Sequence, residues 1–390
     1  MLAVITPGQG SQKPGFLAPW LALPALEARL RWWSAVAGTD LVHLGTEADA
    51  DEIRDTAKTQ PLLTAAALVV AEHLPMYDDQ VLAGHSVGEL AAAALAGVLT
   101  PEAAVTLAAV RGREMAAACA AEHTNMVAVL GGDEDTVLEA IDAHGLYAAN
   151  RNGAGQIVAA GAVDALDKFT ASPPERARVV TMKVAGAFHT PYMAPAEQAL
   201  STVAAGIVPG EPTKLMLSNL DGAAVSHGRD LLLRLVRQVT TPVRWDLCMR
   251  SLADLGVTAV LELPPAGTLT GLLRRAYQGM EVLKLNTPDD LPAARDLIAR
   301  HGAAPNIHAS SEPFPSFRVV VAAAAGTFEP AEDLTEGDTV RAGQVVGHVA
   351  TRQGPVEVAA HDTGVLTEWL AHHRDPVAPG QPLARIGGPA

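Results

Sequence analysis

Short apolar runs alternate with longer stretches of helical periodicity over roughly the first 300 residues of the chain. The runs at residues 2–5 and 80–83 predict strands, because each is brief and bounded by polar or turn-forming residues. Helices are predicted at residues 60–73, 87–96 and 102–121, and Thr100-Pro101 supplies an N-cap and a first helical residue for the last one. This alternation is typical of an α/β fold, in which helices cover a mostly parallel sheet.

Residues 124–186 follow a different order of predicted elements. The pattern predicts two helices, and four strands of which the middle two pair around the turn at residues 152–155. The order βαββαβ is the ferredoxin-like pattern, so we expect a small subdomain inserted at residues 124–186. The strands are expected at residues 125–130, 146–151, 156–160 and 178–184, and the helices at 134–143 and 162–171.

The pattern changes again near residue 303. Residues 303–316 are rich in Pro, Ser and Ala, which is typical of a linker between domains 1–302 and 317–390. Beyond the linker only short strands are predicted, and residues 338–346 match residues 375–383 in the pattern D-x-V-x-x-G-Q. In both copies Val or Leu follows one residue later. The repeat predicts an all-β domain built from two similar halves.

Composition excludes several classes of protein. Lys and Arg number 28 against 43 Asp and Glu, so the net charge is −15, which argues against binding of nucleic acid. Hydrophobic residues make up 49%, enough for a buried core, yet no apolar run approaches the roughly 18 residues of a membrane helix. The two cysteines, Cys119 and Cys248, are far apart in apolar surroundings. We expect buried thiols, no disulfide, no metal site and a cytoplasmic protein.

A candidate nucleophile follows the second predicted strand. Gly84-His85-Ser86-Val87-Gly88 joins a strand to a helix, which is the required context of a nucleophile elbow. The glycines permit the tight turn, and the helix N-terminus offers N–H groups to a developing oxyanion. The alternative is that Ser86 is only the N-cap of the helix.

Two further residues could complete such a site. A serine nucleophile needs a base, and His189 lies directly after a predicted strand and before a turn with Pro191. From the chemistry alone, any of several histidines could fold back onto Ser86. Arg111 lies mid-helix among Ala and Leu and needs an anionic partner, which is either an internal Asp or Glu or a carboxylate of the substrate.

Taken together, these segments resemble the malonyl-CoA:acyl-carrier-protein transacylases and, more broadly, the acyltransferase domains of fatty-acid and polyketide synthases. The resemblance covers roughly residues 1–290 in family order and implies a hydrolase-like parallel-sheet core. This chain departs from the family at two places. Thr6 stands where the family usually has Phe, and Pro-Pro-Ala at residues 264–266 stands where the family has Gly-Pro-Gly. The matching stretches are residues 7–12 (PGQGSQ), 84–89 (GHSVGE), 110–112 (VRG), 150–156 (NRNGAGQ), 186–191 (GAFHTP), 217–219 (LSN), Gln238 with 242–243 (PV), and 269–271 (LTG).

The resemblance implies a role for each matching residue. Ser86 would be acylated, His189 would be its base, and the backbone carbonyl of Gln238 would orient the imidazole. The backbone N–H groups of Gln9 and Val87 would form the oxyanion hole.

The same resemblance resolves the choice left open for Arg111 and bears on substrate size. Arg111 would pair with the free carboxylate of a malonyl group, which acetyl lacks. Phe188, before the histidine, would occupy the volume that an α-methyl group needs, and Val87 after the serine also fits malonyl. We therefore expect malonyl in preference to methylmalonyl or acetyl.

Residues 317–387 resemble the biotinyl/lipoyl carrier domains, with Gly326, Gly337 and Gly364 in family positions. Such domains carry a modifiable lysine at a hairpin tip, and here Gln353 falls nearest to that position. The chain has no lysine after Lys284, so the usual amide to biotin or lipoate cannot form. We expect no cofactor on this domain, which would then dock a partner or stabilise the protein.

The expected function is transfer of malonyl from CoA to the phosphopantetheine thiol of an acyl carrier protein. The alternatives are hydrolysis of acyl thioesters by the same two residues, a polyketide acyltransferase with another extender unit, and a non-catalytic scaffold built around the C-terminal domain. The expected partners are malonyl-CoA and an acidic carrier protein, with neither nucleic acid nor membrane. Candidate carrier contacts are Arg229, Arg234, Arg237, Arg244 and Arg250.

Overall fold

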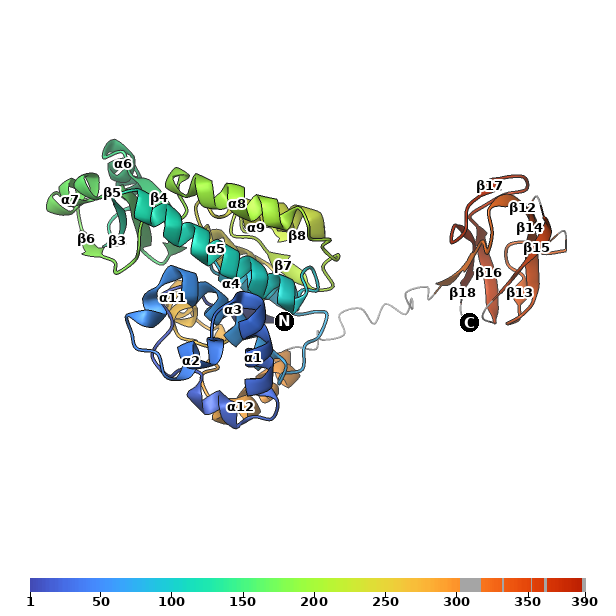
Figure 1. Ribbon diagram of the computed structural model, residues 1–390, viewed down its shortest axis with the longest axis horizontal. Coiled ribbons are helices and arrows are strands. Elements are labelled where there is room, and N and C mark those ends of the chain that lie inside the picture. Colours follow the sequence, from blue (N-terminus) through green and yellow to red (C-terminus); the bar gives the residue numbers. More distant parts are fainter. Residues whose placement is uncertain (302–316, 332, 352, 361–362, 388–390) are drawn as a thin grey trace. The chain divides into compact units, whose positions relative to one another are not determined.

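The computed structural model describes residues 1–301, 317–331, 333–351, 353–360 and 363–387. The chain divides into two compact units, Met1–Ala304 and Pro305–Ala390 (Figure 1). The stretch expected to be a linker, residues 303–316, lies outside the described residues. Each unit is therefore described by itself.

The first unit is built on a six-stranded sheet in the order β10-β9-β1-β2-β7-β8. All neighbouring pairs are parallel except β7 with β8. In the register of β1 with β2, Thr6 lies opposite Gly84, so the loops that follow these two strands leave the sheet side by side. The strands are β1 (Leu2–Thr6), β2 (Val81–Gly84), β7 (Leu215–Leu217), β8 (Ala224–Val225), β9 (Ala259–Glu262) and β10 (Glu281–Lys284).

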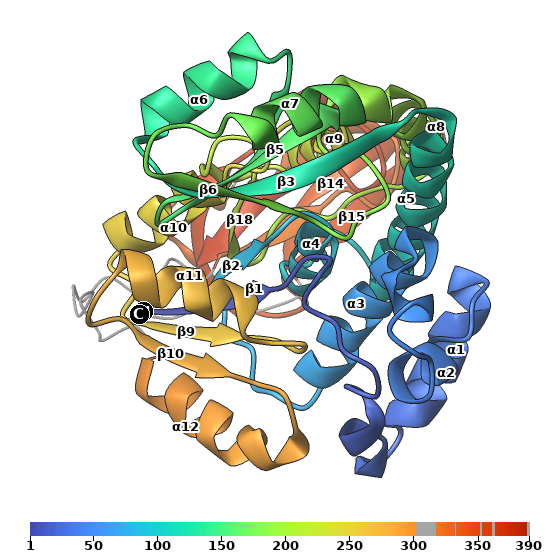
Figure 2. The same ribbon diagram turned by 90° about the vertical axis from the view of Figure 1, so that its left-hand side faces the viewer.

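Helices cover both faces of this sheet, as the alternation in the sequence predicts. Leu2 and Val4 of β1 pack into one core with α3, α4, α5 and α12, whereas Ala3 and Ile5 pack into the other with α10 and α11. Figure 2 shows α11 and α12 on opposite sides of β9 and β10. The helices are α3 (Thr56–Ala71), α4 (Gly88–Leu95), α5 (Pro101–Ala121), α8 (Ala194–Ala204), α9 (Gly228–Arg237), α10 (Trp245–Asp254), α11 (Thr268–Ala276) and α12 (Leu291–His301).

The segment between β1 and α3 holds elements that the apolar pattern does not reveal. They are η1 (Ala18–Ala22), α1 (Leu26–Ala37), α2 (Leu41–Thr46) and η2 (Glu52–Arg54). The N-cap position of α1 is Ala25, whose φ is 64° and whose side chain forms no capping hydrogen bond, so the usual start signal is missing. Trp33 of α1 donates its Nε1–H to Glu102 of α5 at 3.1 Å, which ties this segment to the unit.

A second, four-stranded sheet in the same unit has the order β4-β5-β3-β6, with every pair antiparallel. Its elements follow the order βαββαβ, and both helices pack on the sheet through one apolar cluster that includes Val137 and Phe169. The elements are β3 (Thr124–Gly131), α6 (Glu134–Ala143), β4 (Tyr147–Gly153), β5 (Gln156–Ala162), α7 (Val163–Ala171) and β6 (Ala177–Thr181).

The last of these strands is shorter than the sequence suggests. The strand expected to reach residue 184 ends at Thr181, so His189 does not follow a strand directly. Met182 and Val184 alternate like strand residues, but they pack against the main core and line a cavity beside His189 instead of continuing the sheet. A stretch of eight residues outside any strand or helix, 182–189, carries the chain from the small sheet to His189.

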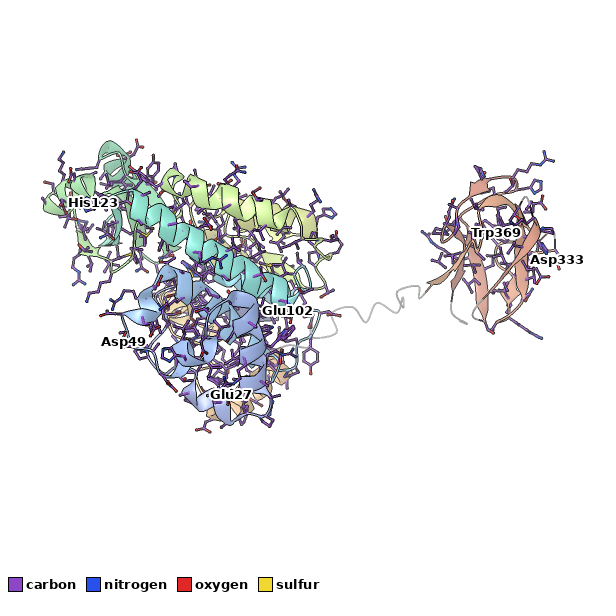
Figure 3. The ribbon with its side chains drawn as sticks, viewed as in Figure 1. Glu27, Asp49, Glu102, His123, Asp333 and Trp369 are labelled. Atoms are coloured by element: carbon purple, nitrogen blue, oxygen red, sulfur yellow. The ribbon has the colours of Figure 1, made fainter. Side chains whose placement is uncertain are left out.

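The second unit contains two four-stranded sheets, β11-β18-β16-β13 and β15-β14-β12-β17. They enclose an apolar cluster in which Phe328 is fully buried and contacts Trp369, with ring centroids 5.8 Å apart. Trp369 is labelled in Figure 3. The strands are β11 (Phe317–Val321), β12 (Gly326–Pro330), β13 (Thr339–Val340), β14 (Val345–Thr351), β15 (Gly354–Ala359), β16 (Gly364–Trp369), β17 (Pro376–Val377) and β18 (Pro382–Gly387).

The repeat predicted in this unit is confirmed by its hydrogen bonds. In each copy the Asp side chain accepts from the backbone N–H three residues earlier, at 2.7 Å for Asp338 and 2.8 Å for Asp375. The Gln side chain of each copy does the same, at 3.0 Å for Gln344 and 3.1 Å for Gln381. The two sequences therefore form two equivalent turns, each leading into a long strand of the unit.

Candidate active site

Ser86 lies on a sharp turn between β2 and α4 and has a φ of 54°, which is uncommon for a residue with a side chain. The turn is possible only with glycine on both sides. A Cβ on Gly84 would lie 2.2 Å from the carbonyl carbon of Gly88, and a Cβ on Gly88 would lie 2.3 Å from the carbonyl oxygen of Thr6. This strained strand-to-helix turn is the geometry of a nucleophile elbow.

The serine and the predicted histidine meet in the structure. Ser86 Oγ lies 2.8 Å from Nε2 of His189, and His189 Nδ1 lies 2.8 Å from the backbone carbonyl oxygen of Gln238. A carbonyl can only accept, so Nδ1 carries the proton and Nε2 is left as the acceptor for the serine hydroxyl. The histidine is 4% exposed, and within the described part of the chain no other histidine forms a hydrogen bond with Ser86 Oγ.

The electrostatic surroundings keep this imidazole neutral. Burial and the positive charge of Arg111 lower the pKa of His189 from 6.5 to about 3, although the bond to the Gln238 carbonyl acts in the opposite direction. A neutral imidazole at physiological pH is the form that can accept a proton. Ser86 and His189 therefore have both the geometry and the protonation state of a nucleophile and its base.

Arg111 projects from the middle of α5 and is 2% exposed. Its Nη1 donates to Oε1 of Gln60 at 2.7 Å, and its Nη2 donates to Oε1 of Gln238 at 2.8 Å and to Ser86 Oγ at 3.3 Å. No carboxylate lies within 4 Å of the guanidinium among the described residues. Burial lowers the pKa of Arg111 to about 10, so the group still carries its charge at neutral pH, beside the nucleophile.

The side chain of Gln238 joins a network that the sequence does not reveal. Its Nε2 donates to a carboxylate oxygen of Glu89 and, at 3.2 Å, to the carbonyl of Ser86. Asn219 also belongs to this network, because its N–H donates to Glu89 at 2.7 Å and its Oδ1 accepts the N–H of Ser86 at 2.8 Å. Burial raises the pKa of Glu89 to about 8, while both N–H donors and the charge of Arg111 act in the opposite direction.

Gln60, Glu89 and Asn219 are the residues that sequence reasoning missed. Glu89 and Asn219 lie inside the matching stretches at residues 84–89 and 217–219, but those patterns give no contact partner and hence no role. Gln60 lies in the polar first part of α3, next to Thr59, so nothing in its sequence surroundings singles it out. For Gln238 the sequence indicated only the backbone carbonyl, not the side chain.

The loop after β1 adjoins the elbow. His85 donates its N–H to the carbonyl of Thr6 at 3.0 Å, and a Cβ on Gly8 would lie 2.7 Å from the carbonyl oxygen of His85. Within the described residues, no acceptor faces the backbone N–H of Gln9 or that of Val87. Both groups predicted for the oxyanion hole are therefore available next to Ser86.

A cavity of about 220 Å³ opens onto these residues. Gln9, Ser86, Arg111, Phe188 and His189 all line it, so every residue predicted for the site except Val87 and Gln238 reaches the cavity. The small sheet forms another part of the wall through Met126, Asn150, Asn152 and Val158. Among the described residues, no cluster of three or more His, Cys, Asp or Glu side chains could hold a metal ion.

Comparison with known proteins agrees with this geometry. Residues 4–294 match the sequence profile of the acyl transferase domain. Over 302 residues the chain is 49% identical to the malonyl CoA-acyl carrier protein transacylase of Mycobacterium tuberculosis, covering 76% of this chain and 100% of the relative. This chain belongs to the malonyl-CoA–acyl-carrier-protein transacylase family. The predicted alternative of a non-catalytic scaffold is therefore not supported.

Solved structures of transacylases share a mixed α/β fold with the 76% of this chain that they cover. The crystal structure of MCAT from Mycobacterium tuberculosis superposes with a TM-score of 0.74 at 48% identity and covers 76% of this chain and 99% of its own. A malonyl-transacylase in complex with its type II polyketide-synthase acyl-carrier protein superposes with a TM-score of 0.71 at 30% identity. It covers 76% of this chain and 99% of its own. In the described part of this transacylase, no helix is both long and apolar enough to cross a membrane.

Proposed function

We propose that this chain transfers a malonyl group from coenzyme A to the phosphopantetheine thiol of an acyl carrier protein. The observation that carries the proposal is the buried guanidinium of Arg111, which lies 3.3 Å from the nucleophilic Ser86 Oγ without a carboxylate partner among the described residues. Family membership supports the same reaction over hydrolysis. The carrier protein and malonyl-CoA are then the partners.

The first half-reaction acylates the serine. Nε2 of His189 takes the proton of Ser86 as Oγ attacks the thioester carbonyl, and the Nδ1–H bond to the Gln238 carbonyl stabilises the imidazolium. The N–H groups of Gln9 and Val87 stabilise the tetrahedral oxyanion. When the C–S bond breaks, the CoA thiolate receives the proton from Nε2, which leaves malonyl-Ser86 and a neutral His189.

The second half-reaction runs the same chemistry in reverse. Nε2 of His189 takes the proton of the carrier thiol, the sulfur attacks the malonyl ester, and Ser86 leaves with the proton returned by His189. A water molecule in place of the thiol would give hydrolysis. The two outcomes share every catalytic group, and they differ only in which nucleophile reaches the ester.

Selection of the acyl group rests on Arg111 and Phe188. A malonyl carboxylate forms charge-assisted hydrogen bonds with the guanidinium, whereas acetyl leaves a buried charge unpaired. Phe188 is 7% exposed, lines the cavity and precedes His189, where it limits the space for an α-methyl group. Together, Arg111 and Phe188 favour malonyl over acetyl, which is smaller, and over methylmalonyl, which is branched.

Arginines of the first unit that form no ion pair with the described residues are the candidate contacts for an acidic carrier protein. Arg234 is ion-paired with Asp221 and Asp230, and Arg244 with Asp246, so these two are already neutralised. The other predicted contacts form no ion pair with the described residues, which leaves their charge for a partner. They are Arg229, Arg237 and Arg250.

The proposal also covers the architecture of the inserted subdomain and of the second unit. The order β4-β5-β3-β6 and the βαββαβ succession support a ferredoxin-like subdomain inserted in the acyltransferase domain. The two sheets and the internal repeat support a biotinyl/lipoyl-like second unit. Gln353 is exposed at the turn between β14 and β15, and no lysine follows Lys284, so this unit carries neither biotin nor lipoate and serves as a docking partner or stabilising part.

Intact-protein mass spectrometry with malonyl-CoA tests the proposal. The expected result is a mass increase of one malonyl group on Ser86 that persists without carrier and moves to added holo carrier protein. Ser86→Ala should give no adduct, and His189→Ala should slow its formation by on the order of 10⁴-fold or more. Release of free malonate without carrier would show hydrolysis instead and overturn the proposal.

A further inference from the structure

The side-chain amide of Gln238 lies between a buried carboxylate and a buried guanidinium. Its Nε2 donates to Glu89, and its Oε1 accepts from Nη2 of Arg111 at 2.8 Å. An amide has one donor end and one acceptor end, and each neighbour here offers only the complementary function. The direction of the Gln238 amide is therefore fixed by Glu89 on one side and Arg111 on the other.

Glu89 is itself held by one backbone donor and one side-chain donor. One carboxylate oxygen accepts the backbone N–H of Asn219 at 2.7 Å, and the other accepts from Gln238. Asn219 is fixed in turn, since its Nδ2 donates to the carbonyl of Gly84 at 2.7 Å. Both oxygens of Glu89 face N–H donors and the charge of Arg111 lies nearby, so this geometry favours the ionised carboxylate, in opposition to the burial that raises its pKa to about 8.

We propose that Glu89 is a positioning residue, which sets the direction of the Gln238 amide and thereby holds Arg111 ready for an acyl group that bears a carboxylate. The proposal rests on the malonyl transfer proposed above. Glu89 is 2% exposed and does not line the cavity, so it acts through Gln238 and not by contact with substrate. Because the backbone carbonyl of Gln238 accepts from His189, the same anchor also supports the base.

The intervening amide explains how Arg111 stays available. A carboxylate in direct contact with the guanidinium would form an ion pair and compete with the substrate carboxylate. An amide accepts one N–H of Arg111 without neutralising its charge. When ionised, Glu89 supplies a compensating negative charge one residue further away, so the buried cation is stabilised but still lacks the partner that malonyl provides.

The substitution Glu89→Gln tests this arrangement with little change of volume. The new amide can turn only one oxygen toward its two N–H donors, and the backbone N–H of Asn219 cannot move. The substituted side chain therefore presents its NH₂ group to Gln238, whose own amide must turn and face Arg111 with a donor. We expect kcat/KM for malonyl-CoA to fall on the order of 10-fold to 100-fold, mainly through a higher KM, while kcat/KM for acetyl-CoA falls less.

The ratio of kcat/KM for malonyl-CoA to that for acetyl-CoA is the readout, because loss of fold alone lowers both values together. Glu262→Gln is the matched control, since Glu262 is another fully buried carboxylate and accepts three backbone N–H bonds away from Gln238. It should lower the melting temperature but leave the ratio at the wild-type value. Glu89→Asp keeps the charge and both acceptors but draws the carboxylate back by one methylene from Gln238, so its ratio should fall between those of wild type and Glu89→Gln.

Each outcome decides the proposal. A lower ratio in Glu89→Gln, with Glu262→Gln unchanged and Glu89→Asp intermediate, supports the positioning role. An unchanged ratio in Glu89→Gln, or equal loss in both Glu89 variants, overturns it while malonyl transfer stands. If Glu89→Gln does not fold, the Glu89→Asp ratio decides alone, and a ratio equal to wild type overturns the role. A wild-type protein without preference for malonyl overturns the proposed function and the positioning role together.

Discussion

Ser86 Oγ lies 2.8 Å from Nε2 of His189, although 103 residues separate the two in the sequence. Both residues have a positive φ, 54° for Ser86 and 59° for His189, in a region that side chains disfavour. Such backbone conformations persist only where the surrounding structure holds them in place. The distance between nucleophile and base is therefore set by two strained turns as well as by side-chain rotamers.

Removal of the Arg111 side chain should change which acyl group is accepted. Arg111→Ala leaves the malonyl carboxylate without a partner, so we expect kcat/KM for malonyl-CoA to fall about 100-fold to 1,000-fold. The value for acetyl-CoA should fall much less, and Arg111→Lys should be intermediate, because lysine keeps the charge without the planar fork. Competition among malonyl-, methylmalonyl- and acetyl-CoA measures this, and a wild-type preference for acetyl-CoA would contradict the assignment.

His189 should remain neutral well into the acidic range. Because burial and Arg111 lower its pKa to about 3, the imidazole should stay in the Nδ1–H form as the pH falls through 6.5, where an unperturbed histidine gains its proton. Long-range ¹H–¹⁵N NMR of the histidine rings, assigned with His189→Gln, reports both the tautomer and the titration. A midpoint near 6.5 for this ring would refute the prediction.

An added methyl group on Gly8 should disturb the oxyanion hole. The Cβ of Gly8→Ala would lie 2.7 Å from the carbonyl oxygen of His85, so the loop that carries the Gln9 N–H must shift away from the elbow. Loss of one oxyanion donor lowers kcat by about 100-fold to 1,000-fold. Gly206→Ala is the control, since its nearest contact would be an ordinary 3.5 Å. Equal rates of Ser86 acylation in both variants would rule out this role of the loop.

The chemistry should not depend on the C-terminal unit. All the site residues lie in Met1–Ala304, and the transacylase of Mycobacterium tuberculosis aligns over its full length with 76% of this chain. A protein ending at Ala304 is expected to form malonyl-Ser86 at the rate of the full chain and to pass malonyl to the same carrier. Normal acylation combined with slower transfer would assign carrier docking to the second unit.

Most of the fold could be predicted from local patterns in the sequence. The elbow at Ser86 could be predicted because a strand, two glycines and a helix follow one another within a few residues. The repeated turns at Asp338 and Asp375 were equally local, since each aspartate bonds a residue three positions away. Helix α1 escaped detection because Ala25 gives none of the usual start signals.

The sequence by itself determined where a nucleophile could form, which strand and helix support it, and that nothing after Lys284 can carry a lysine-linked cofactor. These facts depend on neighbouring residues or on composition alone. Only the tertiary structure decided that Arg111 faces no carboxylate directly, that Glu89 reaches it through Gln238, and that His189 is kept neutral. Burial and contacts between distant segments set these properties, and neither can be read from residue spacing.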